Sequence, residues 1–319
     1  MFPQNILSSG YQKSSPTHLP YICPESVRFL DPHTDTLAKA LRRAKYATAH
    51  FGKWHLGRAE EHWPEHYGFE EAWHGAPDSG PAMPQGYHSP YSFKGGTIPR
   101  DGPPGSYLMD TLSEQVVAYI RQHKDRAFFA SVSQFGVHPP LQSPSEGDTL
   151  RFVKKVDPSG VHGNPIMGAM LKSLDNSLGT IVAELEKQNI LNNTLIFFLS
   201  DNGGNAHMTY DRFTRDGGKN LSAEQVPAWL RTMHKYAGNL PPTNNFPLRG
   251  SKGSLYEGGV RVPFIVTWPG KIPAGVRSAQ LVSTVDIFPT IMDIVNDFVP
   301  SSDPRILRSS SKSPGTQMR

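Results

Sequence analysis

The side chains best suited to chemistry in this sequence are lysines, histidines and an Asp-Asn pair, and each stands near an apolar run that predicts a β-strand. In open parallel sheets, ligands bind outside the carboxyl ends of the strands. We therefore expect these side chains to converge on one edge of a sheet. They are Lys53 and His55 in G-K-W-H-L-G, His138 before a Pro-Pro pair, Asp201 and Asn202 in D-N-G-G, and Lys252 in R-G-S-K-G.

This combination of residue types favours hydrolysis of a sulfate or phosphate ester. Lysines and histidines can neutralise the oxygens of a sulfuryl or phosphoryl group during its transfer. Asp201 and Asn202 can supply the hard oxygen ligands that Ca²⁺ or Mg²⁺ requires. A histidine at the end of a strand can also protonate the departing alkoxide, because its pKa lies near neutrality. The expected activity is that of a hydrolase acting on an oxyanion ester.

Each of these residues also has a purely structural explanation. A D-N-G string after a strand is a common turn and helix-capping sequence, and Lys53 can be a solvated loop lysine. His55 can pack beside the preceding tryptophan, and His138 can hydrogen-bond a loop carbonyl. We expect the other histidines to be surface or packing residues, with His74 and His88 the first to test for substrate contact. They include His62, His66, His74, His88, His162 and His207.

Helix and strand patterns alternate along most of the chain, which predicts an α/β fold with a mostly parallel central sheet and helices on both faces. Apolar residues spaced by three to four predict the helices, and short apolar runs predict strands buried on both faces. The stretch over 58–105 is rich in Gly, Pro, His and aromatic residues and is expected to form a substrate rim. The expected helices are 37–44, 106–123, 165–188 and 286–295, and the expected strands are 46–51, 127–135, 194–200 and 262–268.

Composition argues against several other classes of protein. The 319 residues carry 32 basic and 28 acidic side chains, a net charge of +4, and no run of like charges indicates a nucleic-acid arm or a polybasic anchor. The single cysteine, Cys23, excludes an internal disulfide framework. No stretch of about 18 apolar residues is present to span a membrane, and the N-terminus lacks the apolar run of a secretory signal. We expect no nucleic-acid or membrane partner and leave the localisation open.

Longer strings around these residues resemble the type I sulfatases of the alkaline phosphatase superfamily. The string Y-A-T-A-H-F-G-K-W-H-L-G over 46–57 is similar to the second signature of that family. S-D-N-G over 200–203 resembles its distal metal motif, and L-R-G-S-K-G-S-L-Y-E-G-G-V-R-V-P over 248–263 resembles its lysine loop. The resemblance covers about 36–296 and implies an alkaline-phosphatase-like fold.

The resemblance also implies a role for each matched residue. Lys53 and Lys252 would bind the sulfate oxygens, His55 would orient the nucleophile, and His138 would act near the leaving oxygen. The Asp-Asn pair at 201 and 202 would ligate calcium, with magnesium as the alternative metal. The implied partner is a sulfated small molecule or carbohydrate.

Two features of the family pattern are not visible in the sequence. Sulfatases of this type carry an Asp-Asp pair at the end of the first strand, and a Cys or Ser in C/S-x-P-x-R that becomes the formylglycine nucleophile. Cys23 lies in C-P-E-S-V-R, where Pro comes one place early and Arg one place late, so we expect an ordinary thiol. We therefore expect a partial catalytic domain over 1–299, without the first strand and the C-terminal subdomain, and a disordered tail over 300–319.

The leading interpretation is a sulfuric ester hydrolase of the formylglycine and calcium type, inactive in this form because the nucleophile segment is not visible. A phosphodiesterase or phosphonate monoester hydrolase of the same superfamily is the alternative among enzymes. Turnover of sulfate against phosphate on one aryl scaffold separates these two. A non-catalytic sulfate-binding remnant is the alternative outside enzymes, and it would bind sulfate without hydrolysing sulfate esters.

Overall fold

The computed structural model describes most of the chain between residues 29 and 298. Cys23 and the expected tail over 300–319 lie outside the described residues, so the expectations made for them stay predictions. The described residues are 29–57, 59–75, 81, 85–91, 102–155, 157–215 and 221–298.

A three-stranded parallel sheet lies at the centre of the fold. β1 (Ala47–Gly52) pairs with β2 (Glu71–His74) on one side and with β3 (Phe128–Ser133) on the other. All residues of β1 are buried, as expected for an apolar strand with neighbours on both sides. Because the three strands run the same way, the loops that follow β1 and β3 leave from the same edge of the sheet.

A second sheet holds β4 (Ile196–Leu199) and β5 (Phe264–Thr267), which pair in antiparallel orientation. The central sheet confirms the expectation of an α/β fold with a mostly parallel sheet, but this last pair departs from it. The expectation that β3 and β4 are buried on both faces is wrong, since the residues of both strands are only half-buried. Within the described part of the chain, each of these two strands has a strand partner on one side only.

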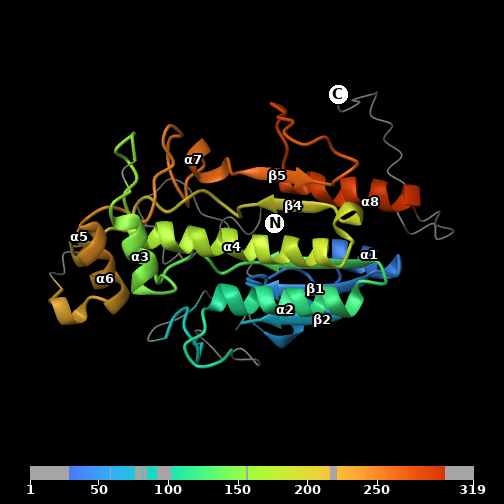
Figure 1. Cartoon of the computed structure of the whole chain (residues 1–319), viewed down its shortest axis with the longest axis horizontal. Coiled ribbons are helices and arrows are strands. Elements are labelled where there is room, and N and C mark those ends of the chain that lie inside the picture. The colour runs from blue at the N-terminus through green and yellow to red at the C-terminus, as the bar shows by residue number, and fades with distance from the viewer. Residues whose placement is uncertain are drawn as a thin grey trace, which may run out of the picture.

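Helices cover both faces of the central sheet (Figure 1). α2 (Leu108–His123) and α4 (Pro165–Lys187) contribute to the main core, in which Phe128, Ala130 and Val132 of β3 also pack. Successive side chains of a strand point to opposite faces of the sheet. Phe129, which lies between Phe128 and Ala130, therefore belongs to the other face.

That other face holds a second, smaller core. There Phe129 of β3 packs with α1 (Leu37–Arg43) and α8 (Ile287–Phe298). The remaining α-helices lie toward the left of Figure 1. No helix among the described residues is long and apolar enough to cross a membrane. The remaining α-helices are α3 (Glu146–Val153), α5 (Tyr210–Arg215), α6 (Ala228–Ala237) and α7 (Glu257–Val260), and the 3-10 helices are Glu60–His62, Pro64–Tyr67, Leu191–Asn193, Ala223–Gln225 and Thr284–Asp286.

The long helix α4 is defined by its ends and by an ion pair with α2. Asn164 caps it by accepting a hydrogen bond from the backbone N–H three residues on, and Pro165 occupies the first helical position, where no N–H is needed. Near the other end, the Glu184 carboxylate accepts two 2.8 Å hydrogen bonds from Arg121 of α2. The Arg121 guanidinium and the Gln188 amide hold the pKa of Glu184 at about 2, well below its usual range.

Two glycines of α4 give a matched test of its packing. A Cβ at Gly179 would meet nothing within 4 Å, whereas one at Gly168 would lie 2.7 Å from the ring of Phe152 on α3. We expect Gly179→Ala to raise the free energy of unfolding by about 1 kcal/mol, because alanine is the better helix former. Gly168→Ala should raise the free energy of unfolding by less, or lower it, because the new methyl group must displace the ring of Phe152. Urea denaturation measures both, and equal effects would contradict the close packing of α3 on α4.

Candidate active site

The loop that follows β1 carries Lys53 and His55. Gly52 ends the strand with a φ of +104°, and a Cβ there would lie 2.0 Å from the carbonyl oxygen of Ser133. The backbone N–H of Lys53 donates to that same oxygen at 2.8 Å. Glycine is the residue that tolerates both the dihedral angle and the contact, so it fixes the half-buried Lys53 beside the end of β3. His55 is exposed two residues further on, with a φ of +65°.

His138 lies in the loop after β3 and is held from two sides. The Tyr87 hydroxyl lies 2.7 Å from the carbonyl oxygen of Phe135 and 2.8 Å from that of His138. The ring Nδ1 lies 2.7 Å from the carbonyl oxygen of Pro139. A carbonyl oxygen can only accept, so Nδ1 carries the hydrogen. Nε2 of the neutral ring is then the nitrogen that can take up a proton.

Burial and two lysines keep the His138 ring neutral. Burial lowers the pKa of His138 most, and the charges of Lys252 and then Lys53 lower it further, to about 4. The carboxylate of Asp201 acts in the opposite direction. A charge shifts a pKa in this way only at short range. The structure therefore brings Lys53, Lys252 and Asp201 together around His138, while their chemical roles stay predictions.

The loop after β4 touches the loop that carries Lys252 through its backbone. The N–H of Gly203 donates to the carbonyl oxygen of Gly259 at 2.9 Å. In return, the N–H of Lys252 donates to the carbonyl oxygen of Gly204 at 3.0 Å. A Cβ at Gly203 would lie 1.8 Å from the carbonyl oxygen of Gly258. No side chain fits there, so the glycine at position 203 allows the two loops to approach.

His55 and Asn202 neighbour this cluster in the chain. His55 follows Lys53 by two positions, and Asn202 directly follows Asp201. Neither His55 nor Asn202 is among the groups that shift the pKa of His138. The hydroxyl of Ser200 donates to the carbonyl oxygen of Asn202 at 2.9 Å, which shapes the turn after β4. The roles of both residues stay predictions from the sequence.

His207 lies nearer to the cluster than the sequence indicated. Burial and the charges of Arg212 and Lys252 lower its pKa, and its Nδ1 lies 3.4 Å from the hydroxyl of Ser251. The string N-A-H after D-N-G-G has no feature that distinguishes this histidine from a surface residue. Tyr87 was equally hidden in the aromatic stretch, because its role depends on a contact with a distant loop.

The described residues form only part of a calcium site. Calcium takes roughly six to eight oxygen ligands, and Asp201 and Asn202 offer side-chain oxygens from two residues. Among the residues that the structure describes, no group of three or more His, Cys, Asp or Glu side chains could hold a metal ion. The donor set of the described residues therefore does not fit calcium on its own.

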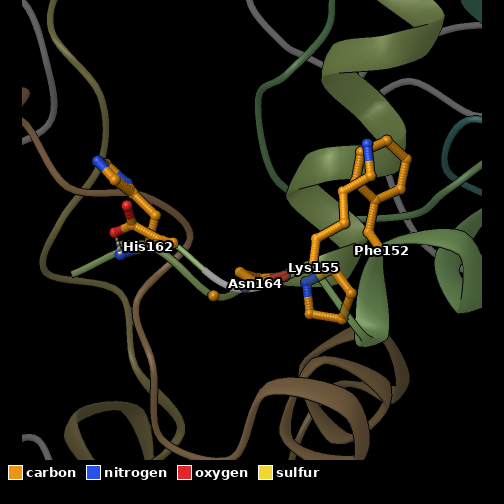
Figure 2. Close-up of a pocket in the computed structure, with 7 residues that line it drawn as sticks. Phe152, Lys155, His162 and Asn164 are labelled. Carbon is orange, nitrogen blue, oxygen red and sulfur yellow. Dashed lines mark hydrogen bonds between the residues drawn. The ribbon is translucent and has the colours of Figure 1, made fainter. Parts of the chain in front are cut away.

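A separate cavity of about 220 Å³ lies beside the start of α4. Figure 2 shows His162 and Lys155 on opposite sides of it, both pointing the same way, with Phe152 beside the lysine. The Asp157 carboxylate accepts hydrogen bonds from backbone N–H groups of its own loop, which orders this segment. None of the predicted site residues lines the cavity, so it is distinct from the cluster around His138. Its lining residues are Phe152, Lys155, Asp157, His162, Gly163, Asn164 and Pro165.

Comparison with known proteins identifies the family. The Sulfatase family model matches residues 4–297. A protein named sulfatase from Formosa agariphila is 32% identical over 225 residues, which are 67% of this chain and 34% of that protein. The N-acetylgalactosamine-6-sulfatase of Canis lupus familiaris is 27% identical over 306 residues, which are 89% of this chain and 49% of that protein. The chain belongs to the sulfatase family.

Solved structures agree with this assignment. The crystal structure of Ps i-CgsB in complex with k-i-k-neocarrahexaose matches with a TM-score of 0.62 at 26% identity, over 83% of this chain and 54% of that chain. PsFucS1 sulfatase from Pseudoalteromonas sp. matches with a TM-score of 0.58 at 25% identity, over 83% of this chain and 51% of that chain. The chain has the alkaline-phosphatase-like fold of these sulfatases, and it spans about half of the length of these solved structures.

The charges around His138 predict how its pKa responds to substitution. Lys252→Ala should raise the pKa because it removes a positive charge, Lys53→Ala should raise it less, and Asp201→Asn should lower it. Two-dimensional NMR of the imidazole nitrogens follows the titration. Lys172→Ala, which removes a lysine of an exposed ion pair on α4, should leave the pKa unchanged. An unchanged pKa in Lys252→Ala would place this ammonium group away from the ring.

Proposed function

We propose that the chain carries the sulfate-binding part of a site for sulfate-ester hydrolysis, of the formylglycine and calcium type that the matched motifs imply. The convergence of Lys53 and Lys252 on His138 is the observation that carries the proposal. Two positive charges beside a neutral imidazole match an oxyanion better than they match a neutral substrate.

In this proposal Lys53 and Lys252 bind the sulfate oxygens, and His138 gives a proton to the leaving oxygen. Without an anion, the pKa of about 4 leaves His138 neutral at pH 7. The negative charge of a bound sulfate group offsets the field of the lysines, so it raises the pKa of the ring. A proton is therefore easier to hold on Nε2 when the ester is bound, which suits general acid catalysis.

The other predicted residues complete the proposal. His55 would orient a formylglycine nucleophile, and Asp201 and Asn202 would supply two of the oxygen ligands of Ca²⁺, with Mg²⁺ as the alternative. These assignments rest on the matched motifs rather than on contacts of the described residues.

The proposed substrate is a sulfated carbohydrate or a small sulfate ester. The solved relative Ps i-CgsB is bound to a neocarrahexaose, and the relative from Canis lupus familiaris is named for N-acetylgalactosamine. The cluster of cations accounts for binding the sulfate group that these substrates share, and it does not distinguish one sugar from another.

Sulfate binding tests the proposal directly. Isothermal titration at low ionic strength is the suitable measurement, because salt screens exposed charges beyond about 8 Å at physiological strength. Lys252→Ala should reduce the affinity for inorganic sulfate, whereas Asp201→Ala should leave it unchanged or raise it by removing a negative charge. Lys172→Ala serves as the control. Loss of sulfate binding in Asp201→Ala would show that a bound metal, rather than the lysines, holds the anion.

The printed chain should bind sulfate without turning over an aryl sulfate, because its sequence contains no C/S-x-P-x-R string. Release of 4-nitrophenol from 4-nitrophenyl sulfate measures this, with calcium present and after coexpression with a formylglycine-generating enzyme. An aldehyde at Cys23 in the mass spectrum, together with turnover that Cys23→Ala abolishes, would overturn the expectation.

A further inference from the structure

Asn245 lies between the two loops of the proposed site, and its side-chain amide bonds to the backbone of both. Its Oδ1 accepts the N–H of Gly204 at 2.9 Å, and its Nδ2 donates to the carbonyl oxygen of Gly204 at 2.9 Å. The same Nδ2 lies 3.3 Å from the carbonyl oxygen of Gly250. An amide that donates to and accepts from one residue pairs with it as a neighbouring strand would.

The two glycines that Asn245 contacts stand close to the residues proposed to bind ligands. Gly204 follows Asn202 by two positions, and Gly250 precedes Lys252 by two. The carbonyl oxygen of Gly204 also accepts the N–H of Lys252 at 3.0 Å. Two donors therefore meet on this one oxygen, which has two lone pairs to accept them. Without the Asn245 amide, the carbonyl oxygen of Gly204 would keep only the hydrogen bond from the N–H of Lys252.

The surroundings give these loops little other regular structure. The loop with Lys252 leads into α7, which has only four residues, and Lys252 itself is half-buried. The separation between the loops therefore depends on individual bonds rather than on a long element. A displacement of about 1 Å at a binding site can change its performance strongly, so the bonds that set this separation matter for ligand binding.

We propose that Asn245 is a positioning residue that holds Lys252 at a fixed place relative to Asp201 and Asn202. Asn245 contacts neither the anion nor a metal in this arrangement, and it acts through the backbone of Gly204 and Gly250. Its link to sulfate binding rests on the proposed function, whereas the coupling of the two loops rests on the geometry alone.

Amide hydrogen exchange tests the coupling without any ligand. In Asn245→Ala, the N–H of Gly204 loses its acceptor and should exchange at least about tenfold faster. The N–H of Lys252, which Asn245 does not touch, should also exchange faster because its acceptor is no longer held. The N–H of Lys53, bonded to Ser133, serves as the internal reference and should keep its protection.

Asn239→Ala is the matched control. The Oδ1 of Asn239 accepts the N–H of Asp211 at 2.9 Å, so it also ties two distant segments, but it does not touch the site loops. This variant should leave the exchange of the Gly204 and Lys252 amides unchanged, whatever it does to the melting temperature. Asn245→Asp keeps the acceptor for Gly204 N–H and removes both donated bonds, so it should protect that amide while Lys252 N–H still exchanges faster.

Sulfate titration then connects the coupling to binding. Asn245→Ala should weaken inorganic sulfate binding about tenfold at low ionic strength, while Asn239→Ala should stay within about twofold of the wild type. If the wild type itself binds no sulfate, the proposed function fails and the exchange of Lys252 N–H still decides the positioning role. Unchanged protection of Lys252 N–H in folded Asn245→Ala would overturn the proposal.

Discussion

The passage of Gly203 beside Gly258, with no room for a Cβ, is the contact on which the arrangement of the site depends. It brings the turn after β4 against the segment that leads into β5, so that hydrogen bonds between the two loops can form. A similar constraint operates at Gly52, where the carbonyl oxygen of Ser133 occupies the place of a Cβ. Within each of these two pairs, the segments are thus aligned by backbone geometry rather than by their charged side chains.

The charges themselves oppose this arrangement. Lys53 and Lys252 are both close enough to His138 to lower its pKa, and like charges at short range repel each other. The carboxylate of Asp201 offsets part of this repulsion. The folded backbone therefore holds an arrangement that the side chains alone would not adopt, and an anion that enters it relieves the repulsion. Selectivity for an anion follows from the fold as much as from the choice of residues.

The sequence predicted those features that depend on local patterns. The apolar spacing identified α4 within a residue, and the apolar run before Gly52 identified β1. An apolar run does not encode its direction, so the antiparallel pairing of β5 was not predictable. The half-burial of β3 was missed because it depends on which neighbours a strand has, rather than on its own residues.

The candidate site also has features that local sequence patterns predicted and features that depend on distant contacts. The positions of Lys53 and Asp201 after strands, and of Lys252 in the loop before the last strand, predicted that these residues converge near His138, whose pKa all three shift. The residues that hold the loops act across large separations: Tyr87 contacts His138 across 51 positions, and Asn245 contacts Gly204 across 41. Such bonds form only in the folded chain, and an asparagine or tyrosine in a loop carries no local mark of them.

The long excursion from β4 to β5 is joined at its base, and this has a consequence for how the protein can change. Thr243 N–H donates to the carbonyl oxygen of Asn205 at 3.3 Å, beside the bond between Lys252 and Gly204, while α5 and α6 lie beyond this joint. The entropy of closing a loop grows only slowly with its length. The segment that contains these two helices can therefore vary in length while the lysine and the acid at its base keep their places, as long as Leu230 and Met233 of α6 still fill their positions in the main core.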